Sequence, residues 1–389
     1  TGEGSMRRVP QGATLVIGLG VSGRAICRHL ERLGRSFVVA DTRPSPPGIE
    51  EFRAAYPEVP LYCGPLSALD MDGAEEVVVS PGVDPEQPAL AALRERRRAN
   101  GEPQLVGEIA LFVRAARAPI AAITGSNAKS TVTTLLGEMA REAGRQVAVG
   151  GNLGTPALDL LAEMPNAELY ILELSSFQLE TTPFLGATSV AYLNLSQDHL
   201  DRHGDMAGYR EAKQAVFRGA RHAVVNGEDA ATWPLEPLPC LERFTTQPPQ
   251  SDEWGIAMRN GQEWLMHGDE ALMTTDALGV AGRHNQANVL AALAMGSQLG
   301  FPLEAMCRAI RRFKGLPHRS EKLAEIEGVM WINDSKGTNV GATLAAIAGI
   351  GSTLTYCRPS LPSWNDTVPS TSANSVWSVP MPTLRPGWN

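Results

Sequence analysis

The stretch TLVIGLGVSG, residues 14–23, places the chain in the α/β class. Its apolar run is followed by three glycines and by a helical pattern over residues 22–33. A second apolar run, residues 37–40, comes next and ends at Asp41. This order of strand, glycine turn, helix and strand predicts a βαβ unit with parallel strands and a right-handed crossover.

The same stretch indicates a nucleotide site. Glycines let the backbone approach a diphosphate, a helix N-terminus supplies amide donors, and the Asp41 carboxylate can accept hydrogen bonds from a ribose. By itself this fingerprint most often indicates NAD or FAD. A glycine turn needed only for strand-to-helix packing is the structural alternative, with Asp41 as a surface residue.

A second βα series begins near residue 119 and carries the loop ITGSNAKST, residues 123–131. A lysine followed by two hydroxyls at a helix N-terminus suits phosphate and Mg²⁺, because amides and an ammonium contact phosphate oxygens while a hydroxyl contacts the metal. Ile123 and Ala128 occupy both glycine positions of the strict Walker spacing. The loop is therefore an imperfect P-loop by pattern alone.

Polar residues follow two further predicted strands of this series. Glu173 comes after one apolar run, and Asp198 and His199 come after another. Ligands of open α/β sheets bind beyond the carboxyl ends of the strands, so we expect these side chains to gather beside Lys129. Carboxylate and neutral imidazole can ligate Mg²⁺, although each residue taken alone is more often structural.

Composition excludes several classes of protein. The 389 residues, 43% hydrophobic and 20% charged, are typical of a soluble globular chain with two or three domains of ~150 residues. A net charge of −8 without a long basic run argues against a nucleic-acid partner. Five scattered cysteines predict neither a disulfide framework nor a zinc site and favour a cytoplasmic location. We expect no membrane span and no leader segment, because no apolar run approaches ~18 residues.

The two ends of the chain differ from the rest. Residues 1–5 precede Met6 and are interpreted as an expression remnant outside the fold. From residue 352 onward the chain is rich in Ser, Thr and Pro, contains neither Lys nor Glu, and has no amphipathic period. We therefore expect residues 352–389 to be irregular.

Seven motifs, in order, resemble those of the Mur ligases of peptidoglycan synthesis. They are GSNAKST (125–131), GNLG (151–154), LELSSFQLE (172–180), DHLD (198–201), GRHN (282–285), LPHR (316–319) and WINDSKGTN (331–339). The resemblance extends over about residues 9–350. Residues 174–180 and the pair Asp41-Thr42 are most similar to members that add D-glutamate to UDP-N-acetylmuramoyl-L-alanine.

The resemblance implies three domains. Residues 6–108 would form a Rossmann-like domain for the UDP-substrate, and residues 109–313 a P-loop ATPase-like central domain with a mostly parallel sheet. Residues 314–351 would begin an incomplete Rossmann-like C-terminal domain for the amino acid. The family pattern stops near residue 351, so we expect this chain to ligate poorly.

The resemblance also assigns site residues, and it places a uridine nucleotide instead of NAD at the first glycine loop. The positions that match UDP-substrate contacts are Gly20, Val21, Ser22, Asp41, Thr42, Arg43, Ser80 and Asn152, with Lys336 and Thr338 from the amino-acid domain. The positions that match ATP contacts are Gly125, Ser126, Asn127, Ala128, Lys129, Ser130, Thr131, Asn285, Asn288, Arg319 and Asp334. Ala128 replaces a glycine common in the family, which is tolerable if the backbone there is right-handed.

Two Mg²⁺ ions are implied with the ATP. Ser130 would ligate one ion, and Glu173, His199 and Lys213 the other. By pattern alone Lys213 is a solvated surface lysine, but its family counterpart is carbamylated. A carbamate presents anionic oxygens to a metal that an ammonium would repel. Lys129, His199 and Lys213 are thus the expected catalytic residues, with His199 as a metal ligand.

The implied reaction begins with attack of the substrate carboxylate on the γ-phosphorus of ATP, which gives an acyl phosphate and ADP. D-glutamate then displaces phosphate and forms the amide. We expect a cytoplasmic monomer without a nucleic-acid partner. Three alternatives stay open: another Mur ligase, an NAD-dependent dehydrogenase that uses residues 18–23, and a non-catalytic nucleotide-binding protein.

Overall fold

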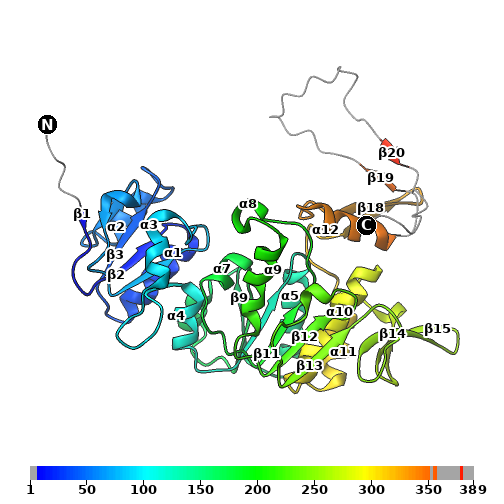
Figure 1. Cartoon of the computed structure of the whole chain (residues 1–389). Coiled ribbons are helices and arrows are strands. Elements are labelled where there is room, and N and C mark those ends of the chain that lie inside the picture. Colours follow the sequence, from blue (N-terminus) through cyan, green and yellow to red (C-terminus); the bar gives the residue numbers. More distant parts are fainter. Residues whose placement is uncertain (1–6, 351–353, 357–376, 380–389) are drawn as a thin grey trace.

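The computed structural model describes residues 7–350, 354–356 and 377–379. Two α/β sheets follow one another along the chain, and a short third part comes after them (Figure 1). Within the described residues, no helix is both long and apolar enough to cross a bilayer. The α/β class predicted from the first glycine loop is confirmed.

The first sheet has five strands in the order β4-β3-β2-β6-β7, and all its pairs are parallel. A short β1 pairs with β5 beside it. The elements are β1 Arg7–Arg8, β2 Thr14–Ile17, α1 Val21–Arg32, β3 Phe37–Asp41, α2 Ile49–Ala55, β4 Leu61–Cys63, β5 Leu69–Asp70, β6 Glu76–Val79, α3 Pro88–Glu95 and β7 Leu105–Gly107. β2 and β3 are buried along their whole length, as expected for parallel strands covered on both faces. The predicted βαβ unit is β2, α1 and β3.

The second sheet has nine strands in the order β16-β15-β14-β13-β12-β11-β8-β10-β9. Its strands are β8 Ile120–Thr124, β9 Val147–Gly151, β10 Leu169–Glu173, β11 Ser189–Tyr192, β12 His222–Asn226, β13 Cys240–Phe244, β14 Trp254–Arg259, β15 Gln262–His267 and β16 Glu270–Thr274. The pairs from β9 to β14 are parallel, and β14 to β16 form an antiparallel extension. The pair Asn260-Gly261 in the sequence predicts a two-residue type I′ turn. Both residues have positive φ, 51° and 74°, so this prediction is confirmed.

Helices cover both faces of the second sheet. They are α4 Glu108–Ala115, α5 Lys129–Glu142, α6 Ala157–Glu163, α7 Ser176–Glu180, α8 Leu200–His203, α9 Met206–Gln214, α10 Arg283–Gln298 and α11 Leu303–Arg312. The first residues of α5 carry the second glycine loop into the helix, and Leu135 and Met139 of α5 share a buried cluster with Leu290 and Leu293 of α10. This packing fixes the start of α5 against the sheet.

The third part contains the hairpin β17 Glu321–Ile326 and β18 Val329–Asn333, followed by α12 Val340–Ile350. The apolar run over residues 329–332 predicts the second strand, whereas no pattern in the sequence indicated the first. Of the tail, the structure describes β19 Leu354–Tyr356 and β20 Trp377–Val379, which pair antiparallel. The rest of the segment expected to be irregular, and residues 1–5, lie outside the described residues.

The two sheets meet at helix α4 (Figure 1). Ile26 and Leu30 of α1 belong to the same buried cluster as Phe112 of α4 and Leu158 of α6. Beside this apolar contact, the Nε and Nη2 atoms of Arg28 donate to the two carboxylate oxygens of Asp159, at 3.0 and 2.7 Å. The junction is therefore apolar at its centre and polar at its rim.

Glu108, the first residue of α4, is a buried carboxyl group in this junction. It is 2% exposed, and its Oε1 accepts a hydrogen bond from the Leu158 amide at 3.3 Å. Burial raises the pKa of Glu108 to about 7, against the opposing effects of the Leu158 amide and the Ser22 hydroxyl. A carboxyl group at the meeting of the two sheets therefore titrates near neutral pH.

The stability of the protein should depend on this titration. The pKa of Glu108 is about 7 when folded and 4.5 in its ordinary state, so the folded protein holds this proton more tightly. The stabilisation that results is complete below the lower value and is lost as pH rises through the higher one. Between pH of about 5 and 8, the wild type should lose about 3 kcal/mol relative to Glu108→Gln. Urea unfolding across this range measures the difference. The exposed Glu163→Gln is the control, and parallel curves for wild type and Glu108→Gln would contradict the prediction.

The residue before α5 departs from expectation. Ala128 has φ 66° and ψ 1°, a left-handed conformation, so the condition of a right-handed backbone is not met. This conformation costs an L-residue about 1–2 kcal/mol relative to the right-handed one. The loop therefore holds Ala128 in a strained state that glycine would adopt freely.

Ala128→Gly should relieve this strain, offset by greater freedom of glycine in the unfolded chain. We expect the free energy of unfolding to stay level or to rise by up to about 1 kcal/mol. The control is Ala140→Gly in the interior of the same helix, which should lower it by at least about 1 kcal/mol. Chemical denaturation compares the two, and an equal loss in both variants would show that Ala128 is unstrained.

Candidate functional site

The first glycine loop is shaped by contact with the end of β6. Gly18 has φ 101°, and a Cβ there would lie 2.8 Å from the Ser80 side chain. The Ser80 hydroxyl donates to the Gly18 carbonyl at 3.0 Å. A Cβ on Gly23 would lie 1.7 Å from the Gly18 oxygen, whereas Gly20 faces open space. Gly18 and Gly23 thus serve packing, and Gly20 leaves the helix N-terminus open to a ligand.

Asp41 lies in this loop but is neither exposed nor free. It is 2% exposed, its Oδ2 accepts from the Leu19 amide at 2.8 Å, and both its oxygens accept from the Arg43 guanidinium. Burial raises the pKa of Asp41, but the bonds from Arg43 and the Leu19 amide outweigh it and lower the pKa overall. Asp41 therefore holds the loop in shape, and the surface alternative is wrong. Val21, Thr42 and Arg43 are exposed beside it, with Ser22 partly buried.

The second glycine loop is held by the segment that follows β11. The Asn127 amide donates to Asn194 Oδ1 at 2.8 Å, and the Asn194 side chain donates to the Asn127 carbonyl at 3.0 Å. The Ser196 amide donates to the Ser126 hydroxyl at 2.8 Å, and Tyr209 lies 3.2 Å from that hydroxyl. Sequence reasoning missed Asn194, Ser196 and Tyr209. Asn194 and Ser196 are polar residues that follow a predicted strand, and this position could have identified them as site residues.

Lys129, Ser130 and Glu173 meet where β8 and β10 end, as their positions after parallel strands predicted. The Ser130 hydroxyl donates to Glu173 Oε2 at 2.8 Å, and the Lys129 ammonium donates to the Gly125 carbonyl at 2.8 Å. Burial lowers the pKa of Lys129, and the nearby Glu173 carboxylate partly opposes this shift. Asn152 lies here as well, 3.4 Å from Glu173 Oε1. The site therefore combines a cation, a hydroxyl and a carboxylate at a helix N-terminus.

Lys213 is buried, so the interpretation as a solvated surface lysine is wrong. It is 1% exposed, and its amine lies 3.2 Å from the Thr124 hydroxyl and 3.1 Å from the Gly125 carbonyl. It also lies over the Tyr209 ring at 5.0 Å. Burial, and then repulsion by Lys129, lowers the pKa of Lys213 well below its ordinary value. A buried amine that readily loses its proton therefore contacts the second glycine loop.

His199 also contacts Tyr209. The two ring centroids are 6.3 Å apart, and His199 Nε2 lies 3.6 Å from Asp198 Oδ2. His199 precedes α8 with φ 50°, a left-handed conformation that turns the chain sharply into this helix. Lys213 and His199 thus share Tyr209 as a neighbour. Among the described residues, no group of three His, Cys, Asp or Glu side chains is arranged to hold a metal ion by itself.

Two side chains of the third part contact the second glycine loop and the start of α5. Arg319 donates to the Ser130 hydroxyl at 3.3 Å, and Asn339 donates to Asn127 Oδ1 at 3.0 Å. Asn339 was quoted within a motif but not singled out as a site residue. Asp334 Oδ1 accepts from the Ser320 amide, next to Arg319, at 2.8 Å.

The remaining predicted residues lie on neighbouring segments. Asn285 donates to the Ala281 carbonyl, and Asn288 donates to Asn285, so both stand in the first turns of α10. Lys336 and Thr338 are exposed in the loop after β18. Thr131 is buried in the first turn of α5.

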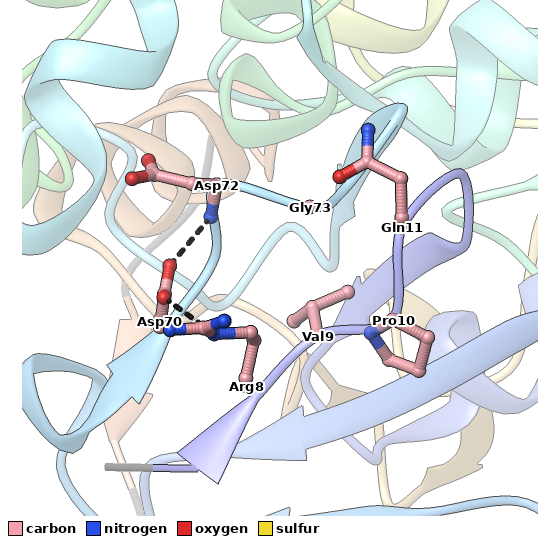
Figure 2. Close-up of a pocket in the computed structure, with 7 residues that line it drawn as sticks. All are labelled: Arg8, Val9, Pro10, Gln11, Asp70, Asp72 and Gly73. Atoms are coloured by element: carbon pink, nitrogen blue, oxygen red, sulfur yellow. Dashed lines mark hydrogen bonds and ion pairs between the residues drawn. The ribbon is translucent and has the colours of Figure 1, made fainter.

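A cavity of about 370 Å³ lies elsewhere, before β2 and β6, at the opposite edge of the first sheet. Figure 2 shows Asp70 accepting hydrogen bonds from Arg8 and from the Asp72 amide. None of the predicted site residues lines this cavity. Its acidic side chains already have partners, since Asp72 also pairs with Arg96.

The chain was compared with known proteins. Residues 123–296 match the Mur ligase middle domain, and residues 12–99 match the Mur ligase MurD-like N-terminal domain. A UDP-N-acetylmuramoylalanine--D-glutamate ligase of Chromohalobacter salexigens is 67% identical over 349 residues, which are 90% of this chain and 76% of that protein. The protein of the same name from Pseudomonas syringae pv. syringae is 51% identical over 342 residues, covering 87% of this chain and 75% of that one.

Solved structures agree in fold. A UDP-N-acetylmuramate:L-alanyl-gamma-D-glutamyl-meso-diaminopimelate ligase of Neisseria meningitides has a TM-score of 0.53 at 17% identity and covers 79% of this chain and 99% of its own. MurF of Acinetobacter baumannii has a TM-score of 0.51 at 16% identity, with 87% and 69% covered. At such low identity these two show the fold alone, whereas the sequence relatives decide the family. The chain belongs to the Mur ligase family.

Proposed function

We propose that this chain is an ATP-dependent, ADP-forming ligase that adds D-glutamate to UDP-N-acetylmuramoyl-L-alanine. The observation that carries the proposal is the meeting of Lys129, Ser130, Glu173 and Lys213 around one phosphate-type loop. The relatives with 67% and 51% identity carry the name of this activity.

The second glycine loop is the proposed ATP site. In the structure, the Lys129 ammonium bonds carbonyl oxygens of its own loop, at Gly125 and Ser126. Phosphate oxygens would replace these carbonyls as stronger, charge-assisted acceptors. Arg319 reaches the same position from the third part, and Asn285, Asn288 and Asp334 are proposed to contact the rest of the nucleotide.

The residues present fit magnesium. Mg²⁺ is usually bound through one or two carboxylates together with phosphate oxygens and waters. Ser130 and Glu173 offer a hydroxyl and a carboxylate 2.8 Å apart, and His199 and Lys213 both neighbour Tyr209. When bound, Mg²⁺ would neutralise phosphate charge. We propose two such ions, one at Ser130 and one held by Glu173, His199 and Lys213.

Lys213 is proposed to be carbamylated. A neutral amine attacks CO₂ and forms a carbamate with loss of one proton, and the lowered pKa of Lys213 favours that neutral form. The carbamate would place anionic oxygens where an ammonium would repel a cation. The buried position beneath the Gly125 carbonyl also protects the adduct from water.

In the proposed mechanism, Lys129 and the loop amides hold the transferred phosphoryl group while the substrate carboxylate attacks it. A carboxylate O–P bond forms, the bond to the β-phosphate oxygen breaks, and ADP leaves. The neutral D-glutamate amine then attacks the acyl carbon, the C–O bond to phosphate breaks, and the nitrogen loses one proton and keeps the other as the amide N–H. The chain contributes positioning and charge stabilisation, the main terms in phosphoryl transfer.

The first domain is the proposed site of the uridine nucleotide. Gly20 opens the N-terminus of α1, while Val21, Thr42 and Arg43 surround it. Ser80 and Asn152 are proposed to face the same substrate, and Lys336 and Thr338 to approach D-glutamate. An NAD-dependent dehydrogenase is not favoured, because both Asp41 oxygens already accept protein donors and are not free for a ribose.

We also propose a cytoplasmic monomer. Four described cysteines, Cys27, Cys63, Cys240 and Cys307, are free thiols. Free thiols are typical of reducing compartments.

The main test measures each step separately. Hydroxylamine traps an acyl phosphate as a hydroxamate, so the first step needs only ATP, Mg²⁺ and UDP-N-acetylmuramoyl-L-alanine; D-glutamate then tests the second. We expect hydroxamate and ADP in the first assay and, because the family pattern stops near residue 351, only a small yield of the amide product, by mass spectrometry, in the second. Lys129→Ala should lower the rate about 10²–10³-fold. Binding of NAD but not of ATP or the UDP-substrate by calorimetry would overturn the proposal.

Carbamylation has its own readout. Native mass spectrometry in bicarbonate should show a mass increase equal to one CO₂, absent from Lys213→Arg. The charge-preserving variant should also lose activity, since a guanidinium cannot carry the carbamate. Exposed Lys322→Arg is the matched control. An adduct that persists in Lys213→Arg would assign the modification to another amine.

A further inference from the structure

Helix α8, which follows His199, has unusually little apolar support. None of its four residues, Leu200–His203, is buried in the core. Its position therefore depends on side-chain contacts at its end rather than on an apolar face. Because His199 immediately precedes α8, those contacts also decide where the His199 ring lies.

Arg202 supplies most of these contacts. Its guanidinium donates to Glu180 Oε1 of α7 at 2.5 Å, and to the Val83 carbonyl of the first domain at 2.8 Å. A weaker bond reaches the Pro81 carbonyl at 3.4 Å. The Arg202 side chain is 11% exposed and that of Glu180 is 14% exposed. One partly buried arginine thus joins α8 to α7 and to the loop that follows Ser80.

Glu180 is the shared partner of the end of α8. Its second oxygen lies 3.5 Å from His203 Nδ1, and the other nitrogen of His203 lies 2.9 Å from the Ser176 hydroxyl. Arg94 of α3 reaches the Glu180 carbonyl at 3.4 Å. The carboxylate therefore neutralises the arginine that crosses between the domains.

Phe177 links Arg202 to His199. The Arg202 guanidinium carbon lies 4.8 Å from the Phe177 ring centroid, and the His199 ring lies 4.8 Å from it in an edge-on arrangement. Cation–π and edge-to-face contacts of this length are attractive and directional. Loss of the guanidinium would free Phe177, and with it the side of the His199 ring that it contacts.

We propose that Arg202, held by Glu180, is a positioning residue that sets the loop after Ser80 in register with His199. This inference rests on the proposed function, in which Ser80 faces the UDP-substrate and His199 the ATP side. The carboxylate of the UDP-substrate and the γ-phosphate of ATP would be held by different domains. A shift of about 1 Å between these two groups can cost about 10²-fold in rate. Arg202 touches neither substrate in this assignment.

The alternative is a tie that serves stability alone, and the chain offers a matched control for it. Arg28 also crosses between the domains and also bonds a carboxylate, but its partner is Asp159 on α6, which it contacts through two nitrogens. Its hydrogen bonds go to Asp159, and neither Phe177 nor His199 is among its hydrogen-bond or cation–π partners. Arg28→Ala therefore removes an interdomain ion pair without disturbing α8.

The experiment measures kcat and the KM values for ATP and the UDP-substrate in the hydroxamate assay with the full chain. Arg202→Ala should lower kcat about 10²-fold with KM for ATP unchanged, while Arg28→Ala should keep the wild-type kcat. Arg202→Lys should recover only part of the loss, because an ammonium lacks the planar guanidinium that faces the Phe177 ring and the second terminal nitrogen that reaches the Pro81 carbonyl. Glu180→Gln should fall between wild type and Arg202→Ala. Equal kcat losses in Arg202→Ala and Arg28→Ala would overturn the proposal.

A second readout does not need turnover. The ring current of Phe177 shifts the His199 ring protons, whose NMR signal is assigned from its loss in His199→Gln. That signal should move in Arg202→Ala and stay in place in Arg28→Ala; an unmoved signal in Arg202→Ala would overturn the proposal. An inactive wild type that still shows the Arg202-dependent shift would refute the ligase assignment alone.

Discussion

The site depends on the hydrogen bonds between Asn194 and the backbone of Asn127. The amide side chain accepts from the N–H of Asn127 and donates to the carbonyl of the same residue, at 2.8 and 3.0 Å. This exchange holds the turn that leads to the left-handed Ala128 and then to α5. Without these hydrogen bonds, the loop would lack the contacts that offset the cost of the left-handed conformation, about 1–2 kcal/mol.

Several parts of the site use that fixed loop as their support. The Gly125 carbonyl accepts from Lys129 at 2.8 Å and from Lys213 at 3.1 Å, and Asn127 Oδ1 accepts from Asn339. Two lysines therefore converge on one carbonyl. Burial lowers the pKa of both amines, and repulsion by Lys129 lowers that of Lys213 further, which leaves Lys213 free to react as a neutral amine.

The sequence predicted local structure well where the pattern was local. The βαβ unit, the Asn260-Gly261 hairpin and the gathering of Ser130 and Glu173 beside Lys129 follow from glycine positions, alternation and strand ends. It predicted poorly where long-range contacts decide. Alanine at position 128 was expected to be tolerable if the backbone there is right-handed. The residues next to it along the chain do not reveal the Asn194 contact that holds the loop.

The sequence by itself determined the α/β class, the two glycine loops and the residue types needed for phosphate and metal chemistry, since these depend on neighbours along the chain. Only the tertiary structure decided which of those residues are free. Asp41 became a buried support, Lys213 a buried amine, and Arg202 a link between domains. Burial and partnership arise when residues far apart in sequence pack together, and they change the chemistry of a side chain without changing its identity.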